Sequence, residues 1–127
     1  MLVVVPTDDG KTVKLGHFGD AKYYLFYELS GSGAKLVKKV ENPYKEFEEH
    51  VHGVEEKRKR IFEIIKEADV VVYTFFGPGG EEFMKRHGKK PFRVEPRTEI
   101  EEALRLLRAG DPSSPVGDAG FSSRERN

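Results

Sequence analysis

A run of four aliphatic residues near the N-terminus constrains the fold more than any other feature. Leu2-Val-Val-Val5 is continuous rather than alternating, is rich in β-branched residues and ends at Pro6. A strand that is apolar on both of its faces belongs inside a sheet that is covered on both sides. The sequence therefore predicts an α/β protein with its first strand in the middle of the sheet.

The remaining elements follow in an order that fixes the topology. Tyr23 to Leu29 alternates as a half-buried strand, Ser30 to Gly33 turns the chain, and Lys35 to Val40 returns as a lysine-bearing edge strand. The chain then alternates between helix and strand: helix 54–68, strand 70–76, helix 81–87, strand 91–94 and a helix capped by Thr98. The order βββαβαβα with right-handed crossovers predicts a mixed five-stranded sheet with helices on both faces.

Length and composition narrow the class of protein. The 127 residues suit one domain, predicted over residues 1–110, while residues 111–127 have the composition of a disordered tail. Lys+Arg and Asp+Glu number 22 each, so no net field favours nucleic acid or a membrane as a partner. No basic leader precedes the first strand, which predicts a cytoplasmic protein, and the 35% charged fraction favours a thermophilic source. The chain has no cysteine, which excludes disulfides, thiolate ligands and cysteine nucleophiles.

Three loops are predicted to meet at one edge of the sheet. The first, third, fourth and fifth strands run the same way, so the segments after Val5, Val40 and Phe76 emerge together, where open sheets bind ligands. These segments carry His17 and Phe18, then Asn42, His50 and His52, then the turn from Gly77 to Gly80. Three of the four histidines would share this edge.

The segment Gly16-His17-Phe18-Gly19 allows two interpretations. The imidazole is either a metal or cluster ligand, with the glycines admitting a bulky ligand, or a local hydrogen-bonding group in a glycine turn. Phe18 fits a core position better than a cofactor contact. A zinc site of His17, His50 and His52 with Asp8 or Asp9 is chemically possible, but the irregular spacing does not indicate one.

Backbone and basic side chains offer two further candidates. The turn Gly77-Pro78-Gly79-Gly80 opens a helix, so its N–H groups either receive an anion or serve a tight turn. The run Lys57-Arg-Lys-Arg60 either binds phosphates or forms a solvated helix face, which acids four residues earlier favour. The strands carry no carboxylate cluster for a two-metal nuclease and no nucleophile beside a base, which argues against an enzyme.

The motifs taken together resemble a known family. Pro6-Thr-Asp8, Gly16-His-Phe-Gly19, Glu41-Asn-Pro43, His52-Gly53, Gly77-Pro78 and Thr98 to Leu104 occur in the order of the dinitrogenase iron–molybdenum cofactor biosynthesis family. The resemblance covers about residues 1–110 and implies a ribonuclease-H-like fold. The sequence departs from the family's pattern in a longer, more acidic segment from Tyr44 to Gly53 and in the two aromatics before Gly77.

The resemblance implies a small, non-catalytic carrier. Its cargo would be an anionic iron–sulfur or iron–molybdenum cluster, bound transiently through His17, with His50 and His52 as auxiliary ligands. The implied contacts to the cofactor are Gly16, His17, Phe18, Gly19, Asn42, His50, His52, Gly77, Gly79 and Gly80. Expected partners are proteins that donate or accept the cofactor, and the chain itself is expected to be a monomer or weak homodimer. The alternative is a protein-interaction or regulatory module of the same fold with no cofactor.

Overall fold

The structure is a computed structural model that describes residues 1–44 and 53–110 of the chain. Its strands are β1 (Leu2–Thr7), β2 (Tyr23–Ser30), β3 (Gly33–Glu41), β4 (Val70–Tyr73) and β5 (Lys90–Arg93). Its helices are α2 (Val54–Ile65), α3 (Gly80–Arg86) and α4 (Ile100–Gly110), with a short 3₁₀ helix, η1, at Phe18–Asp20.

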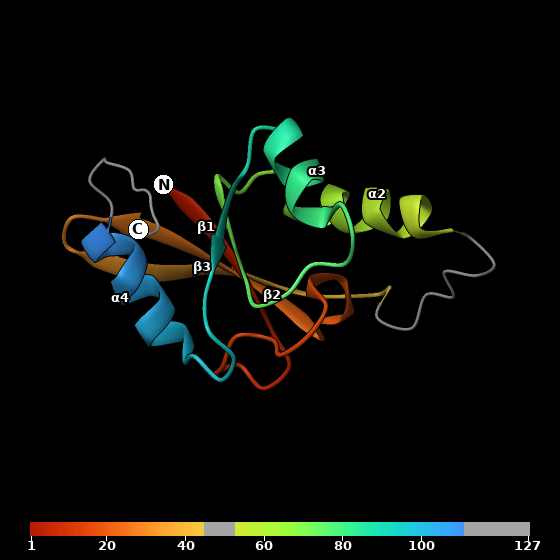
Figure 1. The fold of residues 1–127 in the computed structure, drawn as a ribbon. Helices are drawn as coiled ribbons and strands as arrows, with labels where there is room; N and C mark the ends of the chain where they lie inside the picture. The colour runs from red at the N-terminus through yellow and green to blue at the C-terminus, as the bar shows by residue number, and fades with distance from the viewer. Residues whose placement is uncertain (45–52, 111–127) are drawn as a thin grey trace.

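The strands form one mixed sheet in the order β3-β2-β1-β4-β5, so the predicted topology is confirmed (Figure 1). β1 lies at the centre, antiparallel to β2 and parallel to β4, and β4 is parallel to β5. The continuous apolar run from Val3 to Val5 is fully buried, as a central strand with both faces covered requires.

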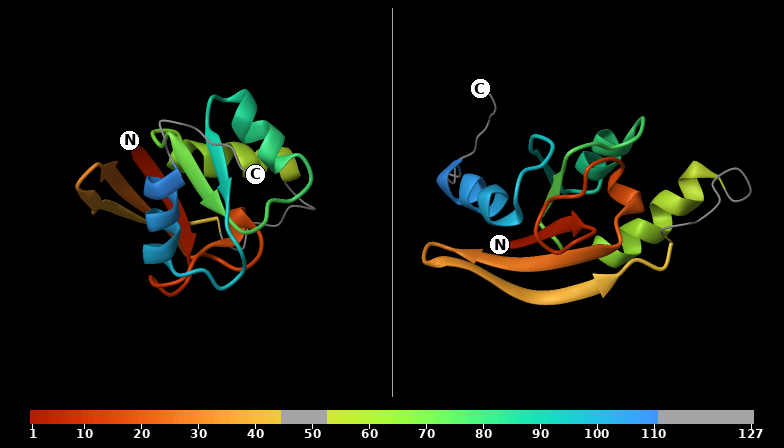
Figure 2. Two further views of the ribbon diagram at one scale, coloured as in Figure 1. Left: turned by 60° about the vertical axis from the view of Figure 1, so that its left-hand side comes forward. Right: turned by 90° about the horizontal axis from the view of Figure 1, so that it is seen from below.

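Helices cover both faces of the sheet, which also agrees with the prediction (Figure 2). Val3 and Val5 pack with Ile100 and Leu104 of α4 on one face. Val4, on the opposite face, belongs to the core that includes the α2 and α3 side chains. The period of two along β1 thus divides its side chains between two apolar layers.

The ends of some elements differ from the sequence-based expectation. β4 ends at Tyr73 rather than residue 76, because the Thr74 hydroxyl donates to the Lys14 carbonyl (2.7 Å) and draws the chain toward the first loop. The prediction that Thr98 caps the last helix is wrong. Its hydroxyl donates to the Glu95 carbonyl (2.6 Å), and α4 begins two residues later at Ile100.

β3 is an edge strand, as its lysines predict. Tyr27 pairs with Leu36 and Phe26 with Lys38, so a β-bulge at Val37 interrupts the ladder. A bulge and several lysines are features that discourage edge-to-edge pairing. Among the described residues, no helix combines the length and the apolar composition needed to cross a bilayer.

Candidate functional site

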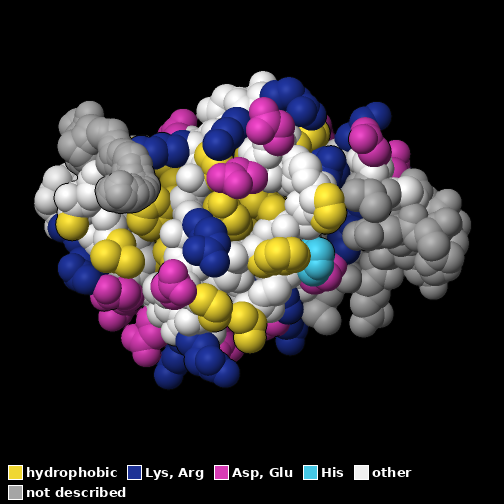
Figure 3. Space-filling view, viewed as in Figure 1, with side chains coloured by type: hydrophobic (Ala, Val, Ile, Leu, Met, Phe, Trp, Pro, Cys, Tyr) yellow, Lys and Arg dark blue, Asp and Glu magenta, His cyan; other side chains and the backbone are white. Residues whose placement is uncertain are grey.

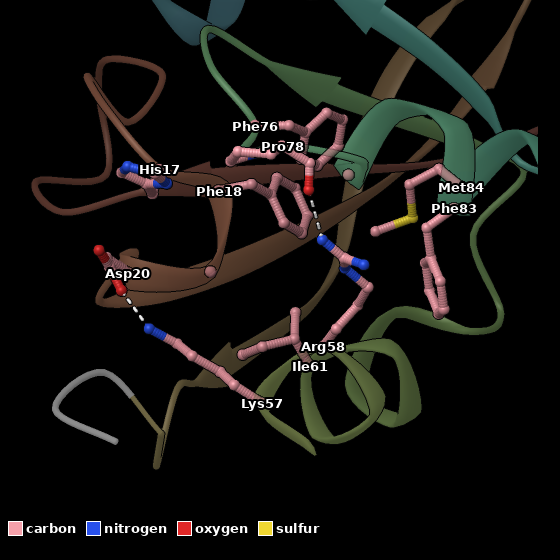
Figure 4. Close-up of a pocket in the computed structure, with 13 residues that line it drawn as sticks. His17, Phe18, Asp20, Lys57, Arg58, Ile61, Phe76, Pro78, Phe83 and Met84 are labelled. Carbon is pink, nitrogen blue, oxygen red and sulfur yellow. Dashed lines mark hydrogen bonds and ion pairs between the residues drawn. The ribbon is translucent and has the colours of Figure 1, made fainter. Parts of the chain in front are cut away.

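A pocket of about 150 Å³ opens at the predicted edge of the sheet (Figure 4). It lies where η1, the amino-terminal half of α2, the turn before α3 and α3 itself come together. Its lining residues are His17, Phe18, Gly19, Asp20, Lys57, Arg58, Ile61, Phe76, Gly77, Pro78, Gly80, Phe83 and Met84. The structure thus confirms that the first loop and the glycine turn converge.

His17 sits at the rim of this pocket with its side chain exposed. A bridge to Phe75 holds its backbone, with the Phe18 N–H donating to the Phe75 carbonyl (3.0 Å). Its ring meets the Phe75 ring edge-on, with centroids 4.8 Å apart. Within the described part of the chain, no hydrogen-bond partner occupies either imidazole nitrogen. The geometry therefore leaves the ring able to bind a ligand.

Two glycines serve the position of His17 in different ways. Gly16 has a φ of +109°, a conformation that side-chain-bearing residues rarely adopt, so this turn requires glycine. Gly77 packs directly against the imidazole. A Cβ there would lie 3.4 Å from both Cε1 and Nδ1 of His17, tighter than an ordinary contact. The histidine thus rests on the bare backbone of the turn between β4 and α3.

Asn42 supports the loop from behind and does not line the pocket. Its side-chain amide donates to the carbonyls of Gly19 (3.0 Å) and Ala21 (2.8 Å), and its Oδ1 accepts from the Tyr44 N–H. The Tyr24 hydroxyl, whose pKa burial raises far above its ordinary value, donates to the Phe18 carbonyl (2.8 Å). These buried groups fix the path of the chain from His17 to Ala21.

α2 contributes two cations from the basic run for which the sequence favours a solvated helix face over a phosphate site. Lys57 is almost wholly buried, and its Nζ makes an ion pair with an Asp20 carboxylate oxygen. Arg58 donates through Nη2 to the Pro78 carbonyl (2.8 Å) and lies over the Phe83 ring. A signal for Arg58 exists in the sequence, because Arg58, Ile61 and Ile65 fall on one helical stripe that faces the core.

The floor of the pocket is apolar and well packed. Phe18, Ile61 and Met84 are each at most 4% exposed. Phe76 stacks on Tyr73 with ring centroids 4.2 Å apart and also contacts Phe18. Phe18 is therefore a core residue that also lines the pocket. The core position is the interpretation that the sequence favoured over a cofactor contact.

The other predicted ligands that the structure describes, Asp8 and Asp9, do not line the pocket. His50 and His52 fall outside the described residues, so their predicted roles stay predictions. Asp8 pairs with Lys14 (2.7 Å), and Asp9 accepts hydrogen bonds from the Lys11 and Thr12 amides, which lower its pKa well below the ordinary value. Among the described residues, no group of three or more His, Asp or Glu side chains is arranged to hold a metal ion.

The surface around the pocket mouth mixes apolar and basic side chains. Leu15 and Phe75 are 59% and 50% exposed, and both lie within two residues of the Gly16–His17 turn or in contact with it. Figure 3 shows histidine and apolar side chains side by side on this face, with both basic and acidic side chains around them. Exposed apolar groups beside a pocket are typical of a surface that meets another molecule.

Comparisons with known proteins identify a family from the sequence and a shared fold from solved structures. The family model described as "Dinitrogenase iron-molybdenum cofactor" matches residues 1–110. The crystal structure of PH0822 has 23% identity and a TM-score of 0.64, covering 87% of this chain and 92% of its own. The NMR structure of TM1290 from Thermotoga, described provisionally as a NifB protein of the DUF35 family, has 20% identity and a TM-score of 0.59. It covers 86% of this chain and 88% of its own. No curated protein matches significantly.

Proposed function

The chain belongs to the dinitrogenase iron-molybdenum cofactor family, and from that premise we propose that it is a non-catalytic carrier of an anionic metal cluster. The observation that carries the proposal is the position of His17 at the rim of a pocket that Lys57 and Arg58 also line. Its imidazole is exposed, and neither ring nitrogen has a hydrogen-bond partner among residues 1–44 and 53–110. The cluster would be of the iron–sulfur or iron–molybdenum type and would be held transiently.

The chemistry of these side chains suits loose binding of such a cargo. A neutral imidazole donates a lone pair to iron or molybdenum, and the nearby Arg58 guanidinium, which is hydrogen-bonded to the Pro78 carbonyl, would offset part of the negative charge of the cluster's sulfides or carboxylates. One imidazole without thiolates binds less tightly than a set of cysteines, which suits a carrier that must release its cargo. The volume of about 150 Å³ is below that of pockets that enclose whole ligands. The cluster would therefore lie at the mouth and remain partly exposed.

We also propose roles for the other contacts that the sequence predicts around the same site. His50 and His52 would act as auxiliary ligands or hydrogen-bond donors, in a segment outside the described residues. Gly77 would present its backbone next to His17, while the Gly80 N–H is already bonded to the Gly77 carbonyl (3.0 Å). The only carboxylate that lines the pocket within the described chain is Asp20, which Lys57 neutralises. A carboxylate held in an ion pair is poorly suited to accept or donate a proton, so the pairing of Asp20 with Lys57 supports binding rather than acid–base catalysis.

A second function is favoured by the exposed Leu15 and Phe75. These side chains would suit a protein-interaction or regulatory module that binds no cofactor. In the carrier reading, the same two residues would instead contact the proteins that donate or accept the cluster. Both readings place the protein in the cytoplasm, as a monomer or weak homodimer.

Anaerobic titration with reconstituted iron–sulfur species and with isolated iron–molybdenum cofactor tests the proposal. Metal content and visible absorption would be measured for wild type, His17→Ala and the control His87→Ala, whose imidazole lies against Phe62 and Phe83 outside the pocket lining. We expect stoichiometric uptake by wild type and the control, and at least a tenfold loss of affinity in His17→Ala, since one ligand bond is removed. Failure of folded wild type to take up any cluster would leave the interaction module as the function.

A further inference from the structure

The proposed carrier function leaves one part of the pocket unused. Away from His17, the pocket continues as a recess formed by Phe18, Ile61, Phe76, Phe83 and Met84, with Arg58 at its edge (Figure 4). In this view Arg58 points toward the Pro78 carbonyl, while His17 lies on the other side of Phe18. An apolar recess adds nothing to the ligation of a metal cluster.

Arg58 is held in place but keeps most of its hydrogen-bonding capacity. Its Nη2 donates to Pro78, and its guanidinium lies 5.4 Å from the centroid of the Phe83 ring. A guanidinium has five N–H donors, so the one hydrogen bond to Pro78 leaves several N–H groups able to bind a ligand. Among the described residues, no carboxylate lies within ion-pair distance of it. The edge of the recess therefore carries an uncompensated, oriented positive charge.

The size and lining of the recess define the complementary ligand. The recess is the apolar part of a pocket whose whole volume is about 150 Å³, so it has room for one small ring or branched alkyl group. A bare anion would leave the apolar floor uncovered, and a neutral hydrocarbon would leave Arg58 without an acceptor. We propose that this recess binds a small organic carboxylate, a ring or branched alkyl body seated on Phe18, Ile61 and Met84 with its carboxylate on Arg58.

This site shares Arg58 with the proposed carrier site but goes beyond that function, because it requires neither His17 nor a cluster. Arg58 would recognise the carboxylate through charge-assisted hydrogen bonds, so a carboxylate should bind about tenfold more tightly than the isosteric amide. The apolar floor should make benzoate bind more than tenfold more tightly than acetate, which lacks the ring.

Backbone amide NMR titration of the full-length chain tests the inference directly. The probes are sodium benzoate, benzamide and sodium acetate, each taken to roughly 20 mM, because a ligand this small is expected to bind with a millimolar Kd. Each would be added to wild type, Arg58→Gln and the control Arg60→Gln. The control removes the same charge from the same helix, at a side chain that pairs with Glu56 (2.8 Å) outside the pocket lining.

We expect saturable benzoate shifts at residues of α3 and η1, weaker benzamide binding and no saturation by acetate. Arg58→Gln should weaken benzoate binding at least tenfold and leave benzamide unchanged, while Arg60→Gln should change neither. Equal binding of benzoate and benzamide, acetate binding as tight as benzoate, or no saturable benzoate shifts would each overturn the proposal. If Arg58→Gln does not fold, the comparison of benzoate, benzamide and acetate binding to wild type still tests the proposal. His17→Ala should change benzoate binding less than twofold, which separates this test from that of the carrier.

Discussion

Asn42 is the single side chain that most strongly fixes the first loop. Its buried amide satisfies the carbonyls of Gly19 and Ala21, which have turned away from the sheet ladder. We expect Asn42→Ala to lower the free energy of unfolding by about 2 to 4 kcal/mol, because two buried carbonyls would lose their donors. Urea denaturation measures this change.

The exposed turn between β2 and β3 supplies the control for Asn42→Ala. In the part of the chain that the structure describes, the Ser32 hydroxyl bonds only to the Ser30 hydroxyl at the surface (3.1 Å). Ser32→Ala should therefore change the free energy of unfolding by less than about 0.5 kcal/mol. Equal, small effects of both substitutions would show that the amide of Asn42 does not hold the loop.

Asp9 links the first loop to the pH dependence of stability. Hydrogen bonds from the backbone amides of Thr12 and Lys11 depress its pKa in the folded state. A depressed carboxyl pKa stabilises the fold above the unfolded-state pKa of about 3.9, and this contribution is lost as the pH falls below that value. Urea midpoints measured from pH 6 to pH 2 should fall more steeply for wild type than for Asp9→Asn. Parallel curves would contradict this role.

At the level of elements, the turn into α3 depends on a close approach of two backbone segments. A Cβ on Gly80 would lie 2.7 Å from Cβ and 2.9 Å from Cγ of Phe76, atoms too near the main chain to move freely. We expect Gly80→Ala to lower the free energy of unfolding by about 1 to 3 kcal/mol, in spite of the better helix propensity of alanine.

Gly31 is the matched control for this substitution. It has no neighbour within 4 Å of a built Cβ and no positive φ. Gly31→Ala should be neutral or slightly stabilising, by about 0.5 kcal/mol, through the unfolded chain. A Gly80→Ala variant as stable as Gly31→Ala would show that α3 can shift away from Phe76 without cost. Thermal or urea unfolding of the two variants gives the comparison.

The strand order could be predicted from the sequence because the predicted elements are compatible with few sheet topologies. A doubly apolar strand at Leu2 to Val5, a hairpin with lysines on its return strand and two crossover helices leave one arrangement of the sheet. The same logic placed His17 and Gly77 at one edge. The strand order and the shared edge both follow from strand direction and burial. These in turn can be inferred from the spacing of the apolar residues and from the order of the elements.

The basic side of the pocket could not be predicted in the same way. Adjacent Lys57 and Arg58 lie on the part of α2 that packs over η1. The acids four residues before Lys59 and Arg60, in the same basic run, suggested a solvated face for the whole run. The structure confirms one such pair, Glu56 with Arg60, on the same helix. Local spacing identifies helical neighbours, whereas the partners of Lys57 and Arg58 are Asp20 and Pro78, far away in sequence.

For the whole molecule, every described member of the two apolar layers lies within the segment that the family model matches. The two buried clusters run from Val3 to Leu107, and the family match ends at residue 110. The pocket is likewise formed by residues between His17 and Met84. Stability and the proposed binding site should therefore belong to residues 1–110, the predicted single domain.

A chain shortened to residues 1–110 tests that inference. We expect its free energy of unfolding to stay within about 0.5 kcal/mol of the full-length value. Its urea m-value should also be unchanged, because the m-value follows the surface buried on folding and both layers are retained. If residues 111–127 pack against the domain, both quantities will fall together, since apolar surface is then lost from the fold. A fall in stability with a constant m-value would instead indicate that the end of α4 at Gly110 is weakened, and restoring a few residues after it should recover the loss.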